Sequence, residues 1–194
     1  MVGTCPLEVD QLLMAGELRC PDCTGELRPW GHARERGVRD ETVVLTVRPR
    51  RSACSQCRCT HVLLPASTLV RRADAVEVVG RALLAKAAGA GHRSIAGLLD
   101  RPVSTVRGWL RRFGARAESL RVLFTALLHA LDASAPAVPV TESGFADALQ
   151  SLGLAAAAAA RLFGPRSAWQ FASAASGGLL LGPSSLLGTA ANTS

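Results

Sequence analysis

Two Cys-x-x-Cys pairs constrain this chain more than any other feature of its sequence. The first pair is Cys20-Pro-Asp-Cys23 and the second is Cys54-Ser-Gln-Cys57, with thirty residues between them. A spacer of two residues lets both thiolates of a pair reach one ion, and two such pairs complete a tetrahedron around Zn²⁺. The spacing therefore predicts one structural zinc ion, held by Cys20, Cys23, Cys54 and Cys57, in preference to two disulfides.

Other residues near these pairs leave alternatives open. Gly25 follows the first pair and is expected to supply a position with positive φ. Cys5 lies outside the spacing, and Cys59 follows Cys57 too closely to share its two-residue turn. The sequence leaves open whether Cys59 or His61 replaces one of the four ligands.

The sequence also indicates a compartment. No N-terminal segment combines basic residues, a long apolar stretch and a small-residue cleavage site. The apolar stretches at 122–131 and 154–163 are about half as long as a membrane span requires. We therefore predict a cytoplasmic, nucleoid-associated protein with no membrane partner, whose reduced thiols favour metal over disulfides.

The basic residues are concentrated in the middle of the chain. Residues 44–121 hold 15 of the 22 basic residues and only 4 of the 15 acidic ones, whereas residues 1–43 carry a net charge of −3 and residues 122–194 of −1. Lys86 is the single lysine, so the arginine content also reflects overall composition. The placement of the charge nevertheless indicates a segment that binds a polyanion.

Local patterns predict the first secondary-structure elements. Residues 7–15 have apolar residues at helical spacing and stop at Gly16, which predicts a short helix. Residues 42–48 are rich in β-branched residues and predict a strand, with a partner near residues 26–30. Residues 67–88 have apolar residues at helical spacing and predict a longer helix.

Residues 92–113 contain a second informative pattern. A short helix is expected to stop near Asp100, which tolerates a left-handed turn, and Pro102 suits the first position of a new helix. The new helix would bury a stripe formed by Val106, Trp109, Leu110 and Phe113. Its outward face would then consist of Ser104, Thr105, Arg107, Gly108, Arg111 and Arg112.

This segment resembles the helix-turn-helix of bacterial DNA-binding proteins. The positions that carry the resemblance are Ile95-Ala96, Leu99, Asp100, Ser104-Thr105-Val106 and Trp109-Leu110. The family usually has glycine where this chain has Asp100. Over residues 5–180 the order of modules is similar to an uncharacterised family of small bacterial zinc-ribbon and helix-turn-helix proteins, and to the N-terminal DNA-recognising part of insertion-sequence transposases. The resemblance implies DNA recognition in or near mobile elements.

The C-terminal third gives weaker signals. Residues 115–133 predict a helix with a broad leucine-rich face that suits either a core or a dimer seam. Residues 134–139 read as a linker, and two short helices are expected at 144–152 and 154–163, before a third that starts at Trp169. The stretch from 177 onwards is expected to be mobile.

The predicted fold class is mainly α with a small β zinc ribbon at the N-terminus, then a helix-turn-helix bundle and a C-terminal helical segment. The predicted segments are an N-terminal helix (1–17), the zinc ribbon (18–65), the helix-turn-helix domain (66–117), a connecting helix (118–134), a C-terminal helical segment (135–176) and a flexible tail (177–194).

The basic outward face of the helix that follows Pro102 predicts DNA binding. Arg107 is the candidate for a guanine, and Ser104 and Thr105 are candidates for nearby base edges or phosphates. The candidates for phosphate contacts are Arg111, Arg112 and Arg116, together with the strand residues Arg48, Arg50 and Arg51. The expected partners are double-stranded DNA, a second copy of the chain, and a separate transposase or integrase subunit.

No catalytic role is predicted. After the helix-turn-helix the acidic residues lie in helical or linker sequence, whereas a nuclease needs several that converge on Mg²⁺. Two other classes of function stay open. One is a protein-interaction adapter that binds partners through its ribbon and leucine-rich helices, and the other is a redox protein with iron at the four cysteines.

Overall fold

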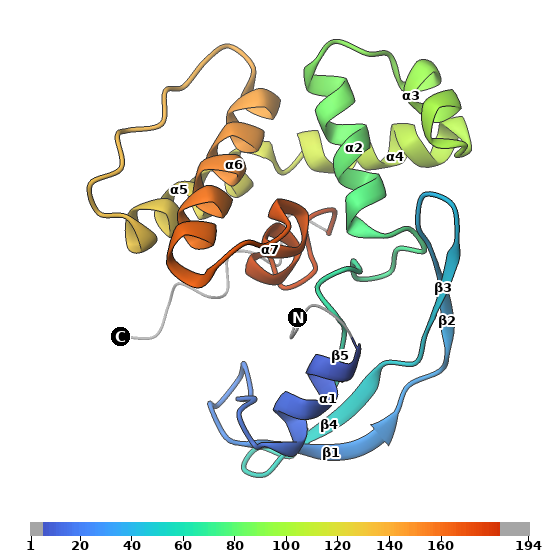
Figure 1. Ribbon diagram of the computed structural model, residues 1–194, viewed down its shortest axis with the longest axis vertical. Coiled ribbons are helices and arrows are strands. Elements are labelled where there is room, and N and C mark those ends of the chain that lie inside the picture. Colours follow the sequence, from blue (N-terminus) through green and yellow to red (C-terminus); the bar gives the residue numbers. More distant parts are fainter. Residues whose placement is uncertain (1–5, 183–194) are drawn as a thin grey trace.

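The computed structural model describes residues 6–182 and shows a mainly helical chain with small antiparallel sheets in its N-terminal half (Figure 1). The expected mixture of helices with a small N-terminal β unit is therefore confirmed. In chain order the elements are α1 (Pro6–Met14), β1 (Leu27–His32), β2 (Arg36–Arg39), β3 (Val44–Val47), β4 (Arg50–Cys54), β5 (Thr60–Leu63), α2 (Val76–Ala87), α3 (His92–Leu99), α4 (Val103–Gly114), α5 (Ala117–Leu131), α6 (Gly144–Phe163) and α7 (Ala168–Ala175).

The N-terminal unit is a three-stranded sheet in the order β1-β4-β5, with α1 packed against β1 and β4. Its strands are antiparallel, and Leu27 of β1 lies opposite Cys54 of β4. The turn after α1 contains Gly16 at φ 69°, so the glycine stop predicted from the sequence is confirmed. The unit has a small core of its own, made of Val9, Leu13, Leu18, Cys20, Leu27, Cys54 and Leu63.

The strand predicted over residues 42–48 forms, but its predicted partner was wrong. β3 pairs with β2 in a two-stranded hairpin, whereas β1, which covers most of residues 26–30, pairs with β4. A local turn explains the difference, because the backbone N–H of Asp40 donates to the carbonyl of Val43 at 2.8 Å. A short turn brings neighbouring segments together at little entropic cost, so the nearer strand becomes the partner.

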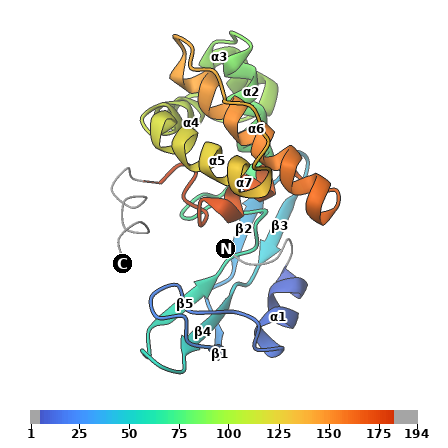
Figure 2. The ribbon, with the colours of Figure 1, turned by 90° about the vertical axis from the view of Figure 1, so that its left-hand side faces the viewer.

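The β2–β3 hairpin leaves the N-terminal sheet and reaches the helices (Figures 1 and 2). Val38 and Val47 are 1% and 5% exposed and belong to the main helical core. The predicted boundary between residues 65 and 66 therefore needs correction, because part of the segment assigned to the ribbon packs with the helix-turn-helix domain.

The helix predicted from residue 67 begins only at Val76. The backbone N–H of Thr68 donates to the carbonyl of Pro65, and that of Val70 donates to the carbonyl of Gly178. These bonds direct the backbone away from a helix, and Arg71 adopts a left-handed φ of 58°. Leu69 is nevertheless fully buried, which explains why its apolar spacing resembled a helix.

Helices α5 and α6 pack against each other over most of their length (Figure 2). The leucine-rich face of α5 is therefore core, with Leu120, Phe124 and Leu128 buried within the same chain. The two short helices predicted at 144–152 and 154–163 are one continuous helix, α6, which runs through Gly153. Burial of its alanine-rich face outweighs the cost of about 1 kcal/mol for a glycine inside a helix.

The C-terminal segment folds back onto α2, in the part of the chain predicted to be the helix-turn-helix domain. Helix α7 packs against α2, and Leu180 and Leu181 are 0% and 2% exposed. The flexible tail predicted over 177–194 is thus wrong for residues 177–182, while residues 183–194 lie outside the described part. Composition alone was misleading, because two of the leucines in this glycine-rich stretch fill the helical core.

The contact between α2 and α7 provides a stability test. A Cβ added at Gly80 would overlap the indole ring of Trp169, so Gly80→Ala is expected to lower the free energy of unfolding by about 1–3 kcal/mol through overpacking. Gly97 in α3 has no atom within 4 Å of such a Cβ, so Gly97→Ala is expected to add about 0.5–1 kcal/mol. Urea denaturation measures both, and shifts of the same sign would contradict this packing.

Candidate metal centre and nucleic-acid interface

The two Cys-x-x-Cys pairs form two turns with the same backbone bonding. The N–H of Cys20 donates to the carbonyl of Gly25 at 2.8 Å, and the N–H of Cys54 donates to the carbonyl of Cys59 at 2.9 Å. Each bond joins the first cysteine of a pair to the residue five positions later. Each turn therefore directs both of its thiols to one side.

The residue after each pair adopts the left-handed region. Thr24 has φ 60° and Arg58 has φ 65°. Gly25 was expected to take this conformation, and that prediction was wrong by one residue. Gly25 has a different role, because a Cβ there would lie 2.9 Å from Sγ of Cys54. The glycine leaves room for a thiol of the opposite pair.

The structure brings together all four predicted thiols. The Sγ atoms of Cys20, Cys23, Cys54 and Cys57 all lie within 4.8 Å of one another. Cys20 and Cys57 are 3.7 Å apart, and Cys23 and Cys54 are 3.4 Å apart. Zn–S bonds of about 2.3 Å in a tetrahedron place the sulfurs about 3.8 Å apart, whereas a disulfide requires about 2.05 Å. The cluster is compatible with a zinc site.

The other candidate ligands lie beside this cluster. The side chain of Cys59 is exposed, and its contribution to the turn is the backbone carbonyl. Nε2 of His61 lies 3.5 Å from Sγ of Cys20 and groups only with Cys20 and Asp22, not with all four thiols. Cys5 lies outside the described residues. The geometry therefore favours the four cysteines as the ligand set.

The thiols differ in acidity. Burial raises the pKa of Cys54, but the backbone N–H groups of Cys57 and Gln56 outweigh it and bring this pKa to about 6. At Cys57 the backbone N–H of Cys59 and the thiol of Cys23 lower the pKa, but burial and the thiols of Cys54 and Cys20 raise it to about 11. Several thiolates this close together repel one another, and a divalent cation removes that repulsion.

Helices α3 and α4 have the geometry predicted for residues 92–113. α3 ends at Asp100, whose φ of 49° and ψ of 54° are left-handed. α4 begins at Val103, so Pro102 is its N-cap and not, as predicted, its first residue. The backbone N–H of Arg101 donates to the carbonyl of Ala96 and closes the end of α3. Val106, Trp109 and Phe113 are buried and Leu110 is partly buried, so this stripe fixes α4 on the core.

The predicted outward residues of α4 separate into two groups. Ser104, Arg107 and Arg111 are exposed, whereas Thr105, Gly108 and Arg112 are half-buried. Nη1 of Arg112 lies 2.8 Å from the place where a Cβ on Gly108 would stand, so this guanidinium lies across the glycine. Ser104, Arg107 and Arg111 therefore form the outermost face of α4.

The structure does not bring the strand arginines to this face. Nε of Arg50 forms an ion pair with Oδ1 of Asp10 at 2.7 Å, so the side chain of Arg50 is held inside the N-terminal unit. Arg48 is exposed and Arg51 is half-buried, and the sheet with β4 lies at the opposite end of the molecule from α4 in both views (Figures 1 and 2). Arg116, which was expected to contact phosphates, is only 1% exposed.

The sequence reasoning missed Arg71 and Arg72 in the loop before α2. With Arg39, they line a hollow of about 330 Å³ that also contacts Ser104, Thr105 and Arg112. The Arg-Arg pair was visible in the sequence, but it lay inside a segment predicted to be helical. The positive φ of Arg71 removes it from that helix and places it beside α4.

Comparison with protein-family models, curated proteins and solved structures finds no match to this chain. Among residues 6–182, no helix combines the length and apolarity that crossing a membrane would require.

Proposed function

We propose that this chain is a sequence-specific DNA-binding protein whose zinc ribbon is structural. The observation that carries the proposal is the face of α4. Ser104, Arg107 and Arg111 are exposed on a helix whose opposite side is fixed in the core, directly after a left-handed turn. A rigid helix with exposed hydrogen-bond donors suits the major groove of DNA.

In this proposal α4 is the recognition helix. Arg107 donates two hydrogen bonds to a guanine, and Ser104 and Thr105 contact adjacent base edges or phosphates. Gly108 leaves room for the guanidinium of Arg112, which lies across it. Arg111 and Arg112 contact phosphates and give affinity that falls with salt, because counterions are released when DNA binds.

Zinc would act at a distance from the DNA. Bound to Cys20, Cys23, Cys54 and Cys57, it supplies the closed thiolate centre that holds the two turns together. The β2–β3 hairpin connects this unit to the helical core, where Val38 and Val47 are buried. The proposed role of zinc is therefore to fix the hairpin beside the helix-turn-helix.

The proposed setting is transposition or transcription regulation, without a catalytic domain in this chain. A homodimer would set the spacing of paired DNA half-sites. The leucine-rich face of α5 is buried against α6, so the dimer would need a different surface. Removal of residues 135–182 would expose the core, so truncation cannot isolate the half-site contacts.

We expect Arg107→Ala and Arg112→Ala to change DNA binding in different ways. Loss of Arg107 should cost about 1–3 kcal/mol of binding free energy on the preferred sequence and relax the choice at one base pair. Loss of Arg112 should weaken all sequences alike and lower the slope of log affinity against log salt by about one unit. Selection from a random DNA pool, with wild type and each variant, measures the difference.

A specific observation supports the adapter as the second candidate. Val43, Val44 and Leu45 at the end of the hairpin are 52%, 65% and 44% exposed. Adjacent exposed apolar side chains are typical of a protein-binding surface. If the wild-type protein enriches no DNA sequence in the selection, the DNA-binding proposal fails and the adapter becomes the better account.

A further inference from the structure

Strand β3 has a backbone edge that faces away from its partner β2. The backbone N–H of Asp40 donates to the carbonyl of Val43 at 2.8 Å, so these two residues form a hydrogen-bonded pair. Hydrogen-bonded and non-hydrogen-bonded pairs alternate along an antiparallel ladder, and in this register the backbone groups of Val44 and Thr46 point away from β2. Among residues 6–182, no hydrogen bond joins these outward groups to another strand. β3 is therefore an open edge.

The other long side of the hairpin is covered. The backbone N–H of Arg39 donates to the carbonyl of Ala73 at 2.6 Å, and the N–H of Ala75 donates to the carbonyl of Arg39 at 2.9 Å. Asp74, which lies between these two residues in the chain, forms an ion pair with Arg39 at 2.8 Å. The loop before α2 thus occupies the outer edge of β2. A further strand can therefore join the hairpin at β3.

The open edge has side chains that suit strand pairing. Residues 42–47, Thr-Val-Val-Leu-Thr-Val, contain no charged residue and no proline. Val43, Val44 and Leu45 are all exposed. Proteins usually protect an exposed edge with a charged side chain, a proline or a bulge, because an open edge is a template for another strand. Residues 42–47 have none of these devices.

The outer strands of the three-stranded sheet are less suited to such pairing. β1 contains Pro29, which has no N–H to donate, and its register with β4 shifts between Pro29 and His32. Helix α1 also packs against β1. β5 has one exposed large apolar residue, Val62, whereas three follow one another at β3. Of the outer strands that the structure describes, β3 thus offers the most apolar edge.

The charges at the two ends of β3 indicate what would pair with it. Asp40 and Glu41 lie at the turn before β3, and Arg48 follows its last residue. Arg48 is exposed, and the side chain of Glu41, which pairs with Arg81, is still 51% exposed. If two copies of β3 lie antiparallel, the acidic turn of each copy is next to Arg48 of the other, whereas a parallel alignment would bring like charges together. The strand is therefore complementary to itself in the antiparallel direction.

We propose that β3 pairs antiparallel with β3 of a second copy of this chain, so that the two hairpins become one continuous sheet. The outward N–H and C=O groups of Val44 and Thr46 in each copy would bond to the backbone of the other, across a two-fold axis. The apolar side chains of residues 43–45 in each copy would lie together and lose contact with water. An isolated two-stranded hairpin is only marginally stable, so the larger sheet would also stabilise each hairpin.

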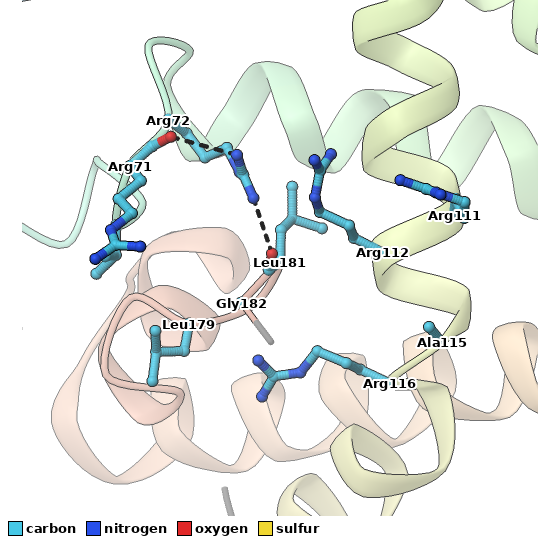
Figure 3. Close-up of a pocket in the computed structure, with 10 residues that line it drawn as sticks. Arg71, Arg72, Arg111, Arg112, Ala115, Arg116, Leu179, Leu181 and Gly182 are labelled. Atoms are coloured by element: carbon cyan, nitrogen blue, oxygen red, sulfur yellow. Dashed lines mark hydrogen bonds between the residues drawn. The ribbon is translucent and has the colours of Figure 1, made fainter. Parts of the chain in front are cut away.

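This pairing does not use the proposed DNA-binding face of α4. Figure 3 shows Arg111 and Arg112 on α4 and Arg72 in the loop before α2, and no residue of β3, all of which the structure describes, lines the hollow between them. The proposal stands on the strand edge alone and needs no DNA. It would also supply the homodimer that paired DNA half-sites require, for which the buried face of α5 is not available.

The test is sedimentation velocity of the full chain without DNA, over a wide range of protein concentration. We expect the wild type to shift from the mass of one chain to that of two as the concentration rises. Val44→Lys should weaken self-association about tenfold or more, because two like charges would then lie close together across the two-fold axis. Val44 is 65% exposed, so this substitution should leave the fold intact. Thr46→Pro should also weaken self-association, since proline removes an outward N–H and no bond within the hairpin.

Val62→Lys is the matched control, because Val62 is also an exposed valine, at 51%, on an outer strand of the other sheet. It adds the same charge and should leave self-association unchanged. A wild type that stays monomeric at every concentration, or equal losses in Val44→Lys and Val62→Lys, would overturn the proposal. So would a dimer that neither Val44→Lys nor Thr46→Pro weakens, since the copies would then meet at another surface.

These measurements separate self-pairing from DNA recognition. A wild type that dimerises through β3 but enriches no DNA sequence would support this inference and refute DNA recognition. A monomer that selects a DNA sequence would do the reverse. A monomer that binds a different protein, with that binding lost in Val44→Lys, would also overturn self-pairing and assign the edge to an adapter role.

Discussion

Cys23→Ser is expected to release zinc and unfold the N-terminal sheet, the largest effect we predict for a single substitution. Binding of structural zinc supplies on the order of 10 kcal/mol of folding free energy. Among residues 6–182, the core around the cysteines contains seven buried residues, too few to compensate for that loss. The larger helical core is separate and should persist. Elemental analysis would give the zinc content per chain, and hydrogen exchange would report on the sheet and the helices.

Cys59→Ser is the control for this experiment. Its thiol is exposed, and only its backbone carbonyl holds the second turn, so zinc content and sheet protection should not change. A wild-type protein without zinc would refute the assignment. Equal loss of zinc in both variants would instead mean that the ligand set is wrong.

Asp74→Ala is expected to lower the free energy of unfolding by about 3–5 kcal/mol, as for other buried ion pairs that lose one partner. Asp74 is 2% exposed and accepts from Arg101 at 2.7 Å and from Arg39 at 2.8 Å. Arg101 also donates to the carbonyl of Asp40 at 2.7 Å. Without the carboxylate, Arg101 remains as a buried charge with no counterion, and the hairpin loses the ion pair between Arg39 and Asp74.

Glu41→Gln provides the comparison, since Glu41 sits in the same hairpin and also pairs with an arginine. The side chains of Glu41 and Arg81 are 51% and 43% exposed, so solvent screens their attraction. This change should cost less than about 1 kcal/mol in chemical denaturation. A loss at Asp74→Ala as small as that at Glu41→Gln would show that the buried pairs do not fasten the hairpin.

Short sequence patterns located both parts of the candidate site. The two Cys-x-x-Cys spacings were enough to predict the cluster, because a two-residue spacer fixes the thiols of each pair locally. The end of α3 at Asp100 and, to within one residue, the start of α4 after Pro102 were also predictable, since both follow from the backbone preferences of single residues. The error at Gly25 was small, and it arose because a contact with Cys54, not φ, requires a glycine there.

Pairings between distant segments were not predictable. Nothing local indicated that β1 pairs with β4, or that Val38 and Val47 enter the helical core. Leu180 and Leu181 lie in a glycine-rich stretch whose composition indicates mobility, yet they are buried. In these cases burial of apolar area in the whole fold outweighs local propensity.

The sequence by itself determined the four thiols, the helix-turn-helix and the basic character of its outer helix, because each depends on spacings within a few turns of chain. Only the tertiary structure decided which arginines act together. It buried Arg116, paired Arg50 with Asp10, and moved Arg72 beside Arg112. Those outcomes depend on how segments separated by tens of residues pack, and charge–charge contacts follow from that packing and not from the order of the residues.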